Sequence, residues 1–337
     1  MKLNIAIIGA GLIGRKRAKV ISKDKHSTLK VICDISKEKA ENLSFEFGGK
    51  AESNWHEVVR QNGIDVIVVS TFNKYLAPIS IAALKNHKHA LCEKPLGRNV
   101  REAKTMLEAA ESSKRLLKTG FNHRFHPAVE KAKMLFDKGE IGDLCFLRCR
   151  YGHGGRIGYE KEWRANKHFC GGGELLDQGV HVLDLFRWFA GDFKEVFCYT
   201  STYFWDMKVE DNAFAIFKNK NGVIATMHTS WTQWKNIFSY EIFGKNGYLI
   251  IEGLGGSYGK EILKIGRRNP NGGVPLEEIF EFKEDDVSWE KEWHEFISAI
   301  KEKRRPSGDA WDGYQVNKMI EAAYKSSKIN KLVKIVQ

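Results

Sequence analysis

An aspartate and a histidine, Asp177 and His181, stand four positions apart in the stretch Gly171–Trp188. That stretch opens with three glycines and continues with leucines and aromatic residues at helical spacing. On a helix, residues i and i+4 lie on the same face, so the carboxylate and the imidazole would point into one small volume. Such a pair fits a buried helix with a satisfied polar contact, half of a metal site, or an acid/base site. The two residues alone do not choose between these interpretations.

A glycine pattern near the start of the chain predicts a dinucleotide-binding loop. Gly9, Gly11 and Gly14 form Gly-x-Gly-x-x-Gly, after the apolar run 3–8 and before a predicted helix over 15–22. The glycines allow a tight turn and a close approach of the backbone to a pyrophosphate. The N-terminus of the helix would then offer free N–H groups and a partial positive charge to that group.

An acidic residue at the end of the second apolar run indicates which dinucleotide binds. Asp34 stands 20 positions beyond the last glycine of the pattern, where a carboxylate can accept hydrogen bonds from a ribose 2′-hydroxyl. The same carboxylate would repel a 2′-phosphate, which favours NAD over NADP. Arg15 and Lys37 stand close by in the sequence and would tolerate a phosphate, so NADP stays open.

Polar residues also follow two later apolar runs. Thr71 and Asn73 come after one predicted strand, and Glu93 and Lys94 come after the next. Ligands of open α/β sheets bind at the carboxyl ends of the strands, so these side chains are expected near the cofactor. Lys94 is followed by a proline, and a lysine held on so rigid a segment is more consistent with a function than with an idle surface position.

The elements that must position these residues form two patterns. Up to residue 120, apolar runs alternate with helical segments in units of roughly 30 residues, which is typical of a doubly wound parallel sheet. The strands are expected over 3–8, 29–33, 65–70, 89–92 and 116–119, and the helices over 15–22, 37–47, 76–86 and 100–113. We therefore predict an α/β protein with an NAD(P)-binding Rossmann domain over 1–120.

The rest of the chain, 121–337, is predicted to be a second domain for substrate binding and oligomerisation. After a helix over 127–136 and a strand over 144–151, it carries a run of successive strands. Asn-Gly turns at two of the junctions indicate antiparallel hairpins. These strands are expected over 196–203, 211–218, 222–231, 238–243 and 248–252, followed by helices over 289–303 and 311–329. The prediction is an α+β domain with a large open, mainly antiparallel sheet, whose last residues can pack back on the first domain.

Composition and charge narrow the range of partners. The chain has 337 residues, which favours two domains, and 42% hydrophobic and 28% charged residues are ordinary for a globular protein. The formal net charge is +12, but the lysines are spread along the chain, which favours a solvated basic surface or an anionic small ligand over nucleic acid. No apolar run approaches the roughly 20 residues that cross a bilayer. We predict no nucleic acid and no membrane partner.

The cysteines carry no recognisable site. None of the six forms a Cys-x-x-Cys pair, which argues against structural zinc. A disulfide framework is also unexpected in a chain of this length. We therefore predict no metal and a reducing, cytoplasmic environment.

Taken together, the motifs resemble those of one family, that of glucose–fructose oxidoreductase, inositol dehydrogenase and MocA. The resemblance spans nearly the whole chain. It implies NAD(P)-dependent oxidation or reduction of a secondary hydroxyl on a sugar, cyclitol or nucleotide sugar, in a homodimer or homotetramer packed through the sheets. The segments that carry it are Gly9–Gly14, Glu93-Lys94-Pro95, Asn122–Pro127, Gly139–Gly142, Trp163-Arg164, the three glycines at 171–173 and Asp177-x-x-x-His181.

The resemblance also implies roles for three residues, Lys94, Asp177 and His181, in a catalytic site. Histidine can accept the hydroxyl proton near neutral pH, so His181 is the expected acid/base. Asp177 would orient the imidazole or the substrate, and Lys94 would stabilise alkoxide character on the reacting oxygen. A proton relay led by Lys94, with His181 only binding substrate, stays open.

Cofactor and substrate residues complete the expectation. The cofactor is expected to contact Gly9, Gly11, Leu12, Ile13, Gly14, Asp34, Thr71, Asn73, Glu93 and Lys94. The substrate is expected to contact Asn122, Arg124, Tyr151, Trp163, Arg164, Asp177 and His181. Arg124 and Arg164 would suit a carboxylate or phosphate and make a nucleotide sugar the favoured substrate, although each is equally consistent with a structural ion pair. The alternative function is a non-catalytic NAD-binding regulator on the same fold.

Overall fold

A computed structural model describes residues 2–283 and 285–336 of the chain. The chain divides into two compact units, and each unit is made of three separate segments of the sequence. The first unit contains the chain up to Phe121 together with His168–Gly171 and Trp289–Asn317. The second contains Asn122–Lys167, Gly172–Ser288 and the chain from Lys318 onward.

The first unit is built on a six-stranded parallel sheet with the strand order β3-β2-β1-β4-β5-β6. This order confirms the predicted doubly wound Rossmann sheet. From β1 the chain adds β2 and β3 on one side and then returns to add β4, β5 and β6 on the other, and ligands of such sheets bind at the switch point between β1 and β4. The strands are β1 Leu3–Ile8, β2 Ser27–Cys33, β3 Lys50–Glu52, β4 Val66–Val69, β5 His89–Glu93 and β6 Leu117–Gly120.

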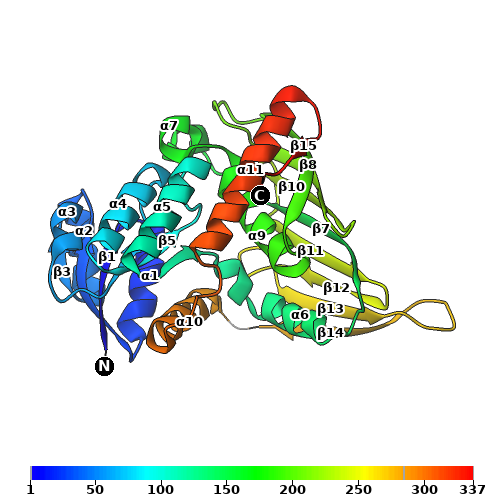
Figure 1. Ribbon diagram of the computed structural model, residues 1–337, viewed down its shortest axis with the longest axis horizontal. Coiled ribbons are helices and arrows are strands. Elements are labelled where there is room, and N and C mark those ends of the chain that lie inside the picture. Colours follow the sequence, from blue (N-terminus) through cyan, green and yellow to red (C-terminus); the bar gives the residue numbers. More distant parts are fainter. Residues whose placement is uncertain (1, 284, 337) are drawn as a thin grey trace. The chain divides into compact units, whose positions relative to one another are not determined.

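Helices cover both faces of this sheet (Figure 1). Ala6 and Ile8 of β1 point toward a core shared with α3, α4 and α5. Ile5 and Ile7 point to the other face, toward a core shared with α1, α2 and α10. Burial on both faces explains why these strands read as continuous apolar runs. The helices are α1 Leu12–Lys23, α2 Lys37–Phe47, α3 Trp55–Arg60, α4 Asn73–Lys85, α5 Val100–Ser113 and α10 Ser288–Glu302.

The second unit is built on a nine-stranded sheet with the order β14-β13-β12-β11-β7-β10-β9-β8-β15. β7 and β10 pair in parallel, and the other described neighbours pair antiparallel, which confirms the predicted mainly antiparallel sheet. The strands are β7 Leu144–Gly152, β8 Phe193–Ser201, β9 Asn212–Asn219, β10 Ile224–Ser230, β11 Ile237–Gly244, β12 Gly247–Glu252, β13 Glu261–Arg267, β14 Leu276–Phe282 and β15 Val333–Lys334.

Helices of the second unit lie against one face of its sheet. α6 packs on β12, β13 and β14, and α9 packs on β7 and β10. The remaining helices are short, except for α11, which passes from the first unit into the second. The helices after β6, apart from α10, are α6 Pro127–Asp137, α7 Lys167–Cys170, α8 Glu174–Asp177, α9 Gly179–Ala190 and α11 Ala310–Ile329, with 3-10 turns at Asn122–Phe125, Tyr159–Lys161 and Trp163–Ala165.

The opposite face of the nine-stranded sheet carries exposed apolar side chains. Cross-strand pairing places Tyr199 beside Phe214 and Phe197 beside Ile216. Tyr199 is 52% exposed and Ile216 is 51% exposed, and Ile224 of the next strand is 43% exposed. We call Phe197, Tyr199, Phe214, Ile216 and Ile224 the outer sheet face.

Within residues 2–283 and 285–336, every helix is too short or too polar to span a bilayer.

Candidate functional site

The glycine loop between β1 and α1 has the backbone geometry that its sequence pattern predicts. Gly9 has a φ of +107°, and a Cβ there would lie 2.4 Å from the carbonyl oxygen of Ser70. A Cβ on Gly14 would lie 1.9 Å from the carbonyl oxygen of Gly9. The Ser70 hydroxyl donates to that same oxygen at 2.8 Å. Glycine is therefore required at both positions for the loop to turn against β4 while α1 starts beside it.

Open space lies in front of the middle glycine. A Cβ on Gly11 would meet no atom within 4 Å, so a ligand can approach the backbone there. Gly11 is also the N-cap of α1 and has no side chain to bond the first N–H groups, and the first helical residue, Leu12, is 74% exposed. Ile13 lies in the same first turn. The loop therefore fits the pyrophosphate of a dinucleotide. A hollow of about 400 Å³ adjoins it, lined by Ala10, Gly11, Leu12, Arg15, Lys39, Asn42 and Leu43.

Asp34 follows β2, and its carboxylate is turned toward the glycine loop. One oxygen accepts the N–H of Ala10 at 2.8 Å, and the other accepts the N–H of Ser36 at 2.9 Å. An ionised carboxylate has about four acceptor positions, so these bonds fix its orientation and leave capacity for ribose hydroxyls. This arrangement supports the ribose-binding role expected for Asp34.

Arg15 and Lys37, the two cations that would tolerate the 2′-phosphate of NADP, each have an acidic partner. Arg15 Nη1 lies 2.5 Å from Glu46 Oε2, and Lys37 Nζ lies 3.6 Å from Glu41 Oε1. The pairs are exposed and contribute little to stability. They do offset the positive charge that a 2′-phosphate would seek, and this favours NAD.

Thr71 and Asn73 lie where β4 gives way to α4. The Thr71 hydroxyl donates to the carbonyl of Phe72 at 3.3 Å. Asn73 is 6% exposed, and its side-chain nitrogen donates to the carbonyl of Cys170 at 2.8 Å. Asn73 thus ties the start of α4 to α7, a contact that no motif in the sequence predicts.

Glu93 ends β5 and Lys94 follows it, so both stand at the carboxyl end of the parallel sheet. Lys94 is partly exposed and joins Pro95 through a cis peptide bond. Glu93 is only 7% exposed, and Arg17 Nε donates to its Oε1 at 2.8 Å. The Glu93 carboxylate therefore faces α1, and the cofactor contact expected of this residue stays a prediction.

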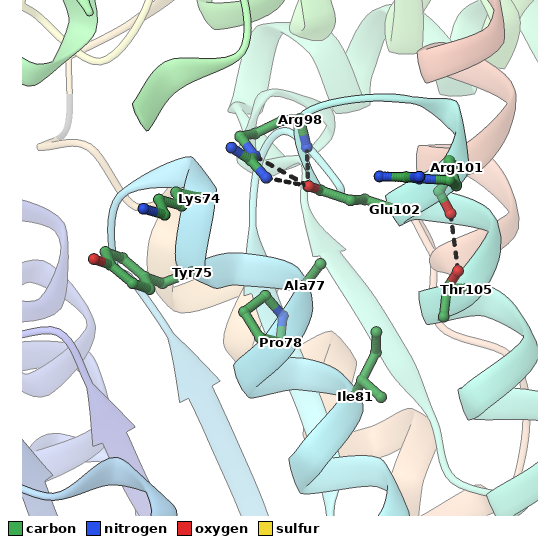
Figure 2. A pocket seen from close by; sticks show the side chains of 9 residues that line it. All are labelled: Lys74, Tyr75, Ala77, Pro78, Ile81, Arg98, Arg101, Glu102 and Thr105. Carbon is green, nitrogen blue, oxygen red and sulfur yellow. Dashed lines mark hydrogen bonds and ion pairs between the residues drawn. The ribbon is translucent and has the colours of Figure 1, made fainter. Parts of the chain in front are cut away.

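A second hollow, of about 410 Å³, lies between α4 and α5 (Figure 2). Ala77, Pro78 and Ile81 give it an apolar wall along α4. Its one acid, Glu102, accepts a hydrogen bond from Arg98 Nη2 at 2.5 Å. The hollow therefore has no acceptor placed for a ribose as Asp34 is, and we assign the cofactor to the glycine loop. The remaining lining residues are Lys74, Tyr75, Arg101 and Thr105.

In the second unit, Asp177 and His181 belong to two successive helices. Asp177 ends α8, His181 lies in the first turn of α9, and Gln178 separates the helices. The single helix expected over this stretch is not found, because the His181 N–H bonds the Gln178 carbonyl only three residues back. The turn tightens where Gly179 approaches β10: a Cβ there would lie 3.2 Å from Met227 Cε. The i, i+4 alignment therefore does not fix how the two side chains lie.

The imidazole of His181 is 5% exposed and stacks on a second histidine. Its ring lies 3.7 Å from that of His123, centroid to centroid, at an interplanar angle of 17°. His123 Nε2 lies 3.0 Å from the Tyr151 hydroxyl, and its Nδ1 lies 3.2 Å from Asn122 Oδ1. An amide oxygen only accepts, so Nδ1 of His123 carries the hydrogen, and in the neutral ring Nε2 accepts from Tyr151. The structure thus brings Asn122, Tyr151 and His181 together through His123.

Neighbouring residues hold this cluster from both ends. Asn122 Nδ2 donates to Ser288 Oγ at 3.0 Å. The ring of Tyr258 lies 5.1 Å from that of Tyr151, and Gln178 Nε2 donates to the Tyr258 hydroxyl at 2.7 Å. Burial raises the pKa of Tyr258 to about 12 and raises the pKa of Tyr151 well above its ordinary value, so both phenols stay neutral at physiological pH.

Asp177 has a guanidinium partner. Arg164 Nε lies 3.4 Å from Asp177 Oδ2, and the Arg164 guanidinium also lies over the ring of Trp163. Burial lowers the pKa of Arg164, but Asp177 and Tyr159 outweigh that effect and raise it. Trp163, Arg164 and Asp177 therefore form one group, with Arg164 28% and Asp177 17% exposed at their side chains.

Arg124 is the expected substrate residue that the structure places elsewhere. Its Nε donates to Asp184 Oδ2 at 2.7 Å and its Nη2 to Asp184 Oδ1 at 2.5 Å. Arg124 is 4% exposed and Asp184 is fully buried. Of the two interpretations left open by the sequence, the structural ion pair is the one found, and Arg124 is not included in the proposed substrate site.

Sequence reasoning missed His123, Tyr258 and Gln178. His123 stands between two residues that were singled out, and its buried position follows from the 3-10 turn Asn122–Phe125. Tyr258 lies in a loop of the second unit and carried no motif. Among the residues that the structure describes, no group of His, Cys, Asp or Glu could hold a metal ion, and the six cysteines are free thiols.

Comparison with known protein families gives two matches along the chain. Residues 3–121 match an oxidoreductase family with an NAD-binding Rossmann fold. Residues 129–250 match the GFO/IDH/MocA C-terminal domain.

Individual relatives cover nearly the whole sequence. Levoglucosan dehydrogenase of Pseudarthrobacter phenanthrenivorans is 25% identical over 97% of this chain and 98% of its own. Myo-inositol 2-dehydrogenase of Thermotoga maritima is 25% identical over 99% and 98% of the two chains. The structure of levoglucosan dehydrogenase in complex with NADH and levoglucosan aligns over 100% of both chains, with a TM-score of 0.91 at 24% identity.

Proposed function

Because the chain belongs to the GFO/IDH/MocA family of oxidoreductases, we propose that it interconverts a secondary hydroxyl and a ketone on a small free sugar or cyclitol. Its Rossmann domain binds NAD, and its relatives are dehydrogenases named for sugars and cyclitols. The observation that carries the proposal is the buried His181–His123–Tyr151 cluster, an arrangement suited to proton transfer.

We assign the acid/base role to His181. An imidazole exchanges a proton near neutral pH, and the hydroxyl proton must leave when an alcohol is oxidised. The stacked ring of His123 supports this role, because a neutral ring face is a favourable neighbour for an imidazolium. When bound, NAD supplies the nicotinamide that accepts the hydride.

Asp177 and Lys94 are proposed to act on the substrate oxygen and its surroundings. Arg164 limits the directions in which the Asp177 carboxylate can turn, so Asp177 can accept one substrate hydroxyl in a defined orientation. Lys94, at the end of β5, is proposed to donate to the reacting oxygen and stabilise its developing negative charge. These assignments rest on the residue types and on the family motifs that contain them.

The proposed substrate is a free sugar rather than a nucleotide sugar. The nucleotide-sugar interpretation depended on Arg124 and Arg164 as binding groups for phosphate. Arg124 is engaged by Asp184, and Arg164 is engaged by Asp177. Relatives named for levoglucosan and myo-inositol support the smaller substrate. Trp163, whose ring lies under the Arg164 guanidinium, is kept as a proposed substrate contact.

A panel of substrates with a matched variant tests this function. NADH formation at 340 nm would be measured with levoglucosan, myo-inositol and glucose 6-phosphate, together with NADH binding by fluorescence. His181→Asn is expected to abolish turnover and leave NADH binding unchanged, and the exposed His26→Asn should behave as the parent protein. Full turnover in His181→Asn would refute the acid/base assignment.

The alternative is a non-catalytic NAD-binding regulator. It predicts NADH binding with no change in absorbance for any substrate in the panel. The presence of Lys94, Asp177 and His181 in one chain supports the enzyme instead.

The assembly proposed is a homodimer or homotetramer that buries the outer sheet face. A row of exposed aromatic and aliphatic side chains on a broad sheet is typical of an interface between subunits. Tyr199, Phe214, Ile216 and Ile224 are each at least 39% exposed in the single chain.

A further inference from the structure

A buried arginine ties the helix of the glycine loop to the strand that ends before Lys94. Arg17 lies on α1 and is fully buried. Its Nε donates to Glu93 Oε1 at 2.8 Å, and its Nη2 lies 2.6 Å from the same oxygen. Because Glu93 is the last residue of β5, this contact fixes the backbone at the point from which Lys94 projects.

A second carboxylate holds Arg17 from the opposite side. Glu292 of α10 is fully buried, and its Oε2 lies 2.6 Å from Arg17 Nη1. The ring of Trp289 lies 4.6 Å from the guanidinium carbon of Arg17. Burial lowers the pKa of Arg17, but Glu292 and Glu93 outweigh that effect and raise it, so the guanidinium stays charged. Lys118, also fully buried, lies 3.9 Å from Glu292 Oε1 and offsets the second acid.

Gly120, the last residue of β6, leaves space for the Arg17–Glu93 pair. A Cβ on Gly120 would lie 2.9 Å from Glu93 Oε2 and 3.2 Å from Arg17 Nη2. Glycine is the residue that leaves both groups undisturbed. The pair is therefore enclosed by β5, β6, α1 and α10, all of which belong to the first unit.

The far end of the segment that carries Lys94 is anchored as well. Arg98 donates to Glu102 through its backbone N–H at 2.8 Å and through its guanidinium (Figure 2). Between the two ends, Asn317 Nδ2 donates to the carbonyl of Leu96 at 2.7 Å. The segment from Glu93 to Arg98 is thus held at its beginning, middle and end.

A buried network of charges adds little to the stability of a fold, because taking charged groups out of water is costly. Replacing such a network with apolar residues of similar volume is often neutral or stabilising, whereas removing one partner is costly. Stability alone is therefore a weak explanation for two carboxylates and two cations buried together next to Lys94. The position of the network, between the cofactor helix and the end of β5, points to orientation of the site.

We propose that Arg17 is a positioning residue: through Glu93 it holds Lys94 in register with the glycine loop on α1. The inference rests on the catalytic role proposed for Lys94. Arg17 also engages the Glu93 carboxylate, which would otherwise be the nearest acid along the chain to the Lys94 ammonium. Without Arg17, Glu93 is free to capture Lys94 and draw it away from the substrate oxygen.

Steady-state kinetics of four variants test this role. Arg17→Lys keeps the charge but cannot bridge two carboxylates with a planar fork, and misplacement of a catalytic group by about 1 Å lowers kcat by roughly 100-fold. KM for NAD and the Kd for NADH should stay near the parent values. Arg17→Met should lose kcat similarly, and Arg17→Met combined with Glu93→Gln should recover part of it, because the amide no longer captures Lys94. The control is Lys19→Met, an exposed residue of the same helix.

Two further measurements separate the possible failures. Lys94→Ala tests the proposed function itself: if it retains full kcat, the role of Lys94 is refuted whatever Arg17 does.

Acetylation of Lys94, followed by peptide mass spectrometry against the exposed Lys104, reports its placement without any substrate. A changed Lys94 labelling rate in the Arg17 variants, and an unchanged rate in Lys19→Met, supports the inference. Parent-like kcat and Lys94 labelling in folded Arg17→Lys would overturn it. A loss of kcat that follows weaker NADH binding would also overturn it, because Arg17 would then act on the cofactor site. If neither single variant folds, Arg17→Met with Glu93→Gln and Glu292→Gln takes their place, because it removes the charges of Arg17 and of both its acid partners and leaves Lys118 with Glu295 at 3.6 Å. This variant loses the anchor of β5 on α1, so its Lys94 labelling rate should still differ from the parent rate, and parent-like labelling together with parent-like kcat would overturn the inference.

Discussion

Replacing Asp34 with serine should reverse the preference of the enzyme between its two possible dinucleotides. Hydrogen bonds to an ionised acceptor contribute about 1.5–3 kcal/mol each, so losing two ribose contacts costs about 3–6 kcal/mol. That loss corresponds to roughly a 100- to 10,000-fold increase in Kd for NADH.

The same change removes an opposing charge from NADPH. A carboxylate and one phosphate charge about 4 Å apart repel by about 4 kcal/mol at an effective dielectric constant of 20. The Ala10 N–H, which Asp34 occupies at 2.8 Å, also becomes available in Asp34→Ser. NADPH binding should therefore tighten by at least about tenfold, since even a third of that repulsion equals one decade in Kd.

Fluorescence titration with NADH and NADPH measures both effects without a substrate. The matched control is Glu108→Gln, which makes the same change in net charge at an exposed residue paired with Lys104 on α5. Glu108→Gln should leave both dissociation constants within about threefold, as expected for an exposed pair. NADH affinity in Asp34→Ser within threefold of the parent value, or NADPH affinity that does not improve, would refute the assignment of Asp34 to the ribose.

Three other predictions concern stability and assembly. Asp184→Leu should lower the free energy of unfolding by about 3–5 kcal/mol, because it leaves Arg124 charged and buried, and adding Arg124→Met should restore most of the loss in urea unfolding. Burial, and to a lesser degree the charge of Arg115, lowers the pKa of His89 from 6.5 to about 4. The folded state therefore prefers the neutral imidazole, and this preference stabilises the fold in full above pH 6.5. That stability is lost as the pH falls from 6.5 toward 4, at most about 1.4 kcal/mol per pH unit, and urea unfolding of His89→Gln should show a weaker pH dependence. Ile216→Glu should lower the mass of the proposed oligomer in light scattering, whereas an unchanged mass would exclude the outer sheet face as the interface.

Local patterns in the sequence were sufficient for most elements of the fold. The strand β1 is apolar over Ile5–Ile8 because both of its faces are buried there. In β9 every second residue is exposed, but two of the exposed residues, Phe214 and Ile216, are apolar, so burial alternates where polarity does not. Gly9 and Gly14 are dictated by backbone contacts within the loop, so their spacing alone predicted its geometry. The three-residue β3 was missed because it is too short and too exposed to show a period.

Side-chain partners far apart in the sequence were not predictable in the same way. Arg124 has the composition of a phosphate ligand, and only the packing of α9 against the 3-10 turn Asn122–Phe125 places Asp184 beside it. Glu93 stands at the cofactor end of its strand, yet a strand position does not say that an arginine of α1 occupies its carboxylate. A spacing rule specifies which backbone atoms are close, whereas the direction of a charged side chain depends on the other charges buried with it.

The break between α8 and α9 changes what the Asp177/His181 pair means. On one continuous helix, their spacing alone would make Asp177 the partner of His181. The tightened turn at Gln178 removes that constraint, and Asp177 has a cation, Arg164, at 3.4 Å. The His181 ring stacks on that of His123, whose Nδ1 faces an amide oxygen and whose Nε2 faces a phenol of raised pKa. Both contacts suit a neutral His123, and a neutral ring lets His181 take up a proton beside it without repulsion. We therefore expect His123, with the residues that fix its tautomer, to support His181 in the proposed acid/base role as much as the carboxylate four residues away does.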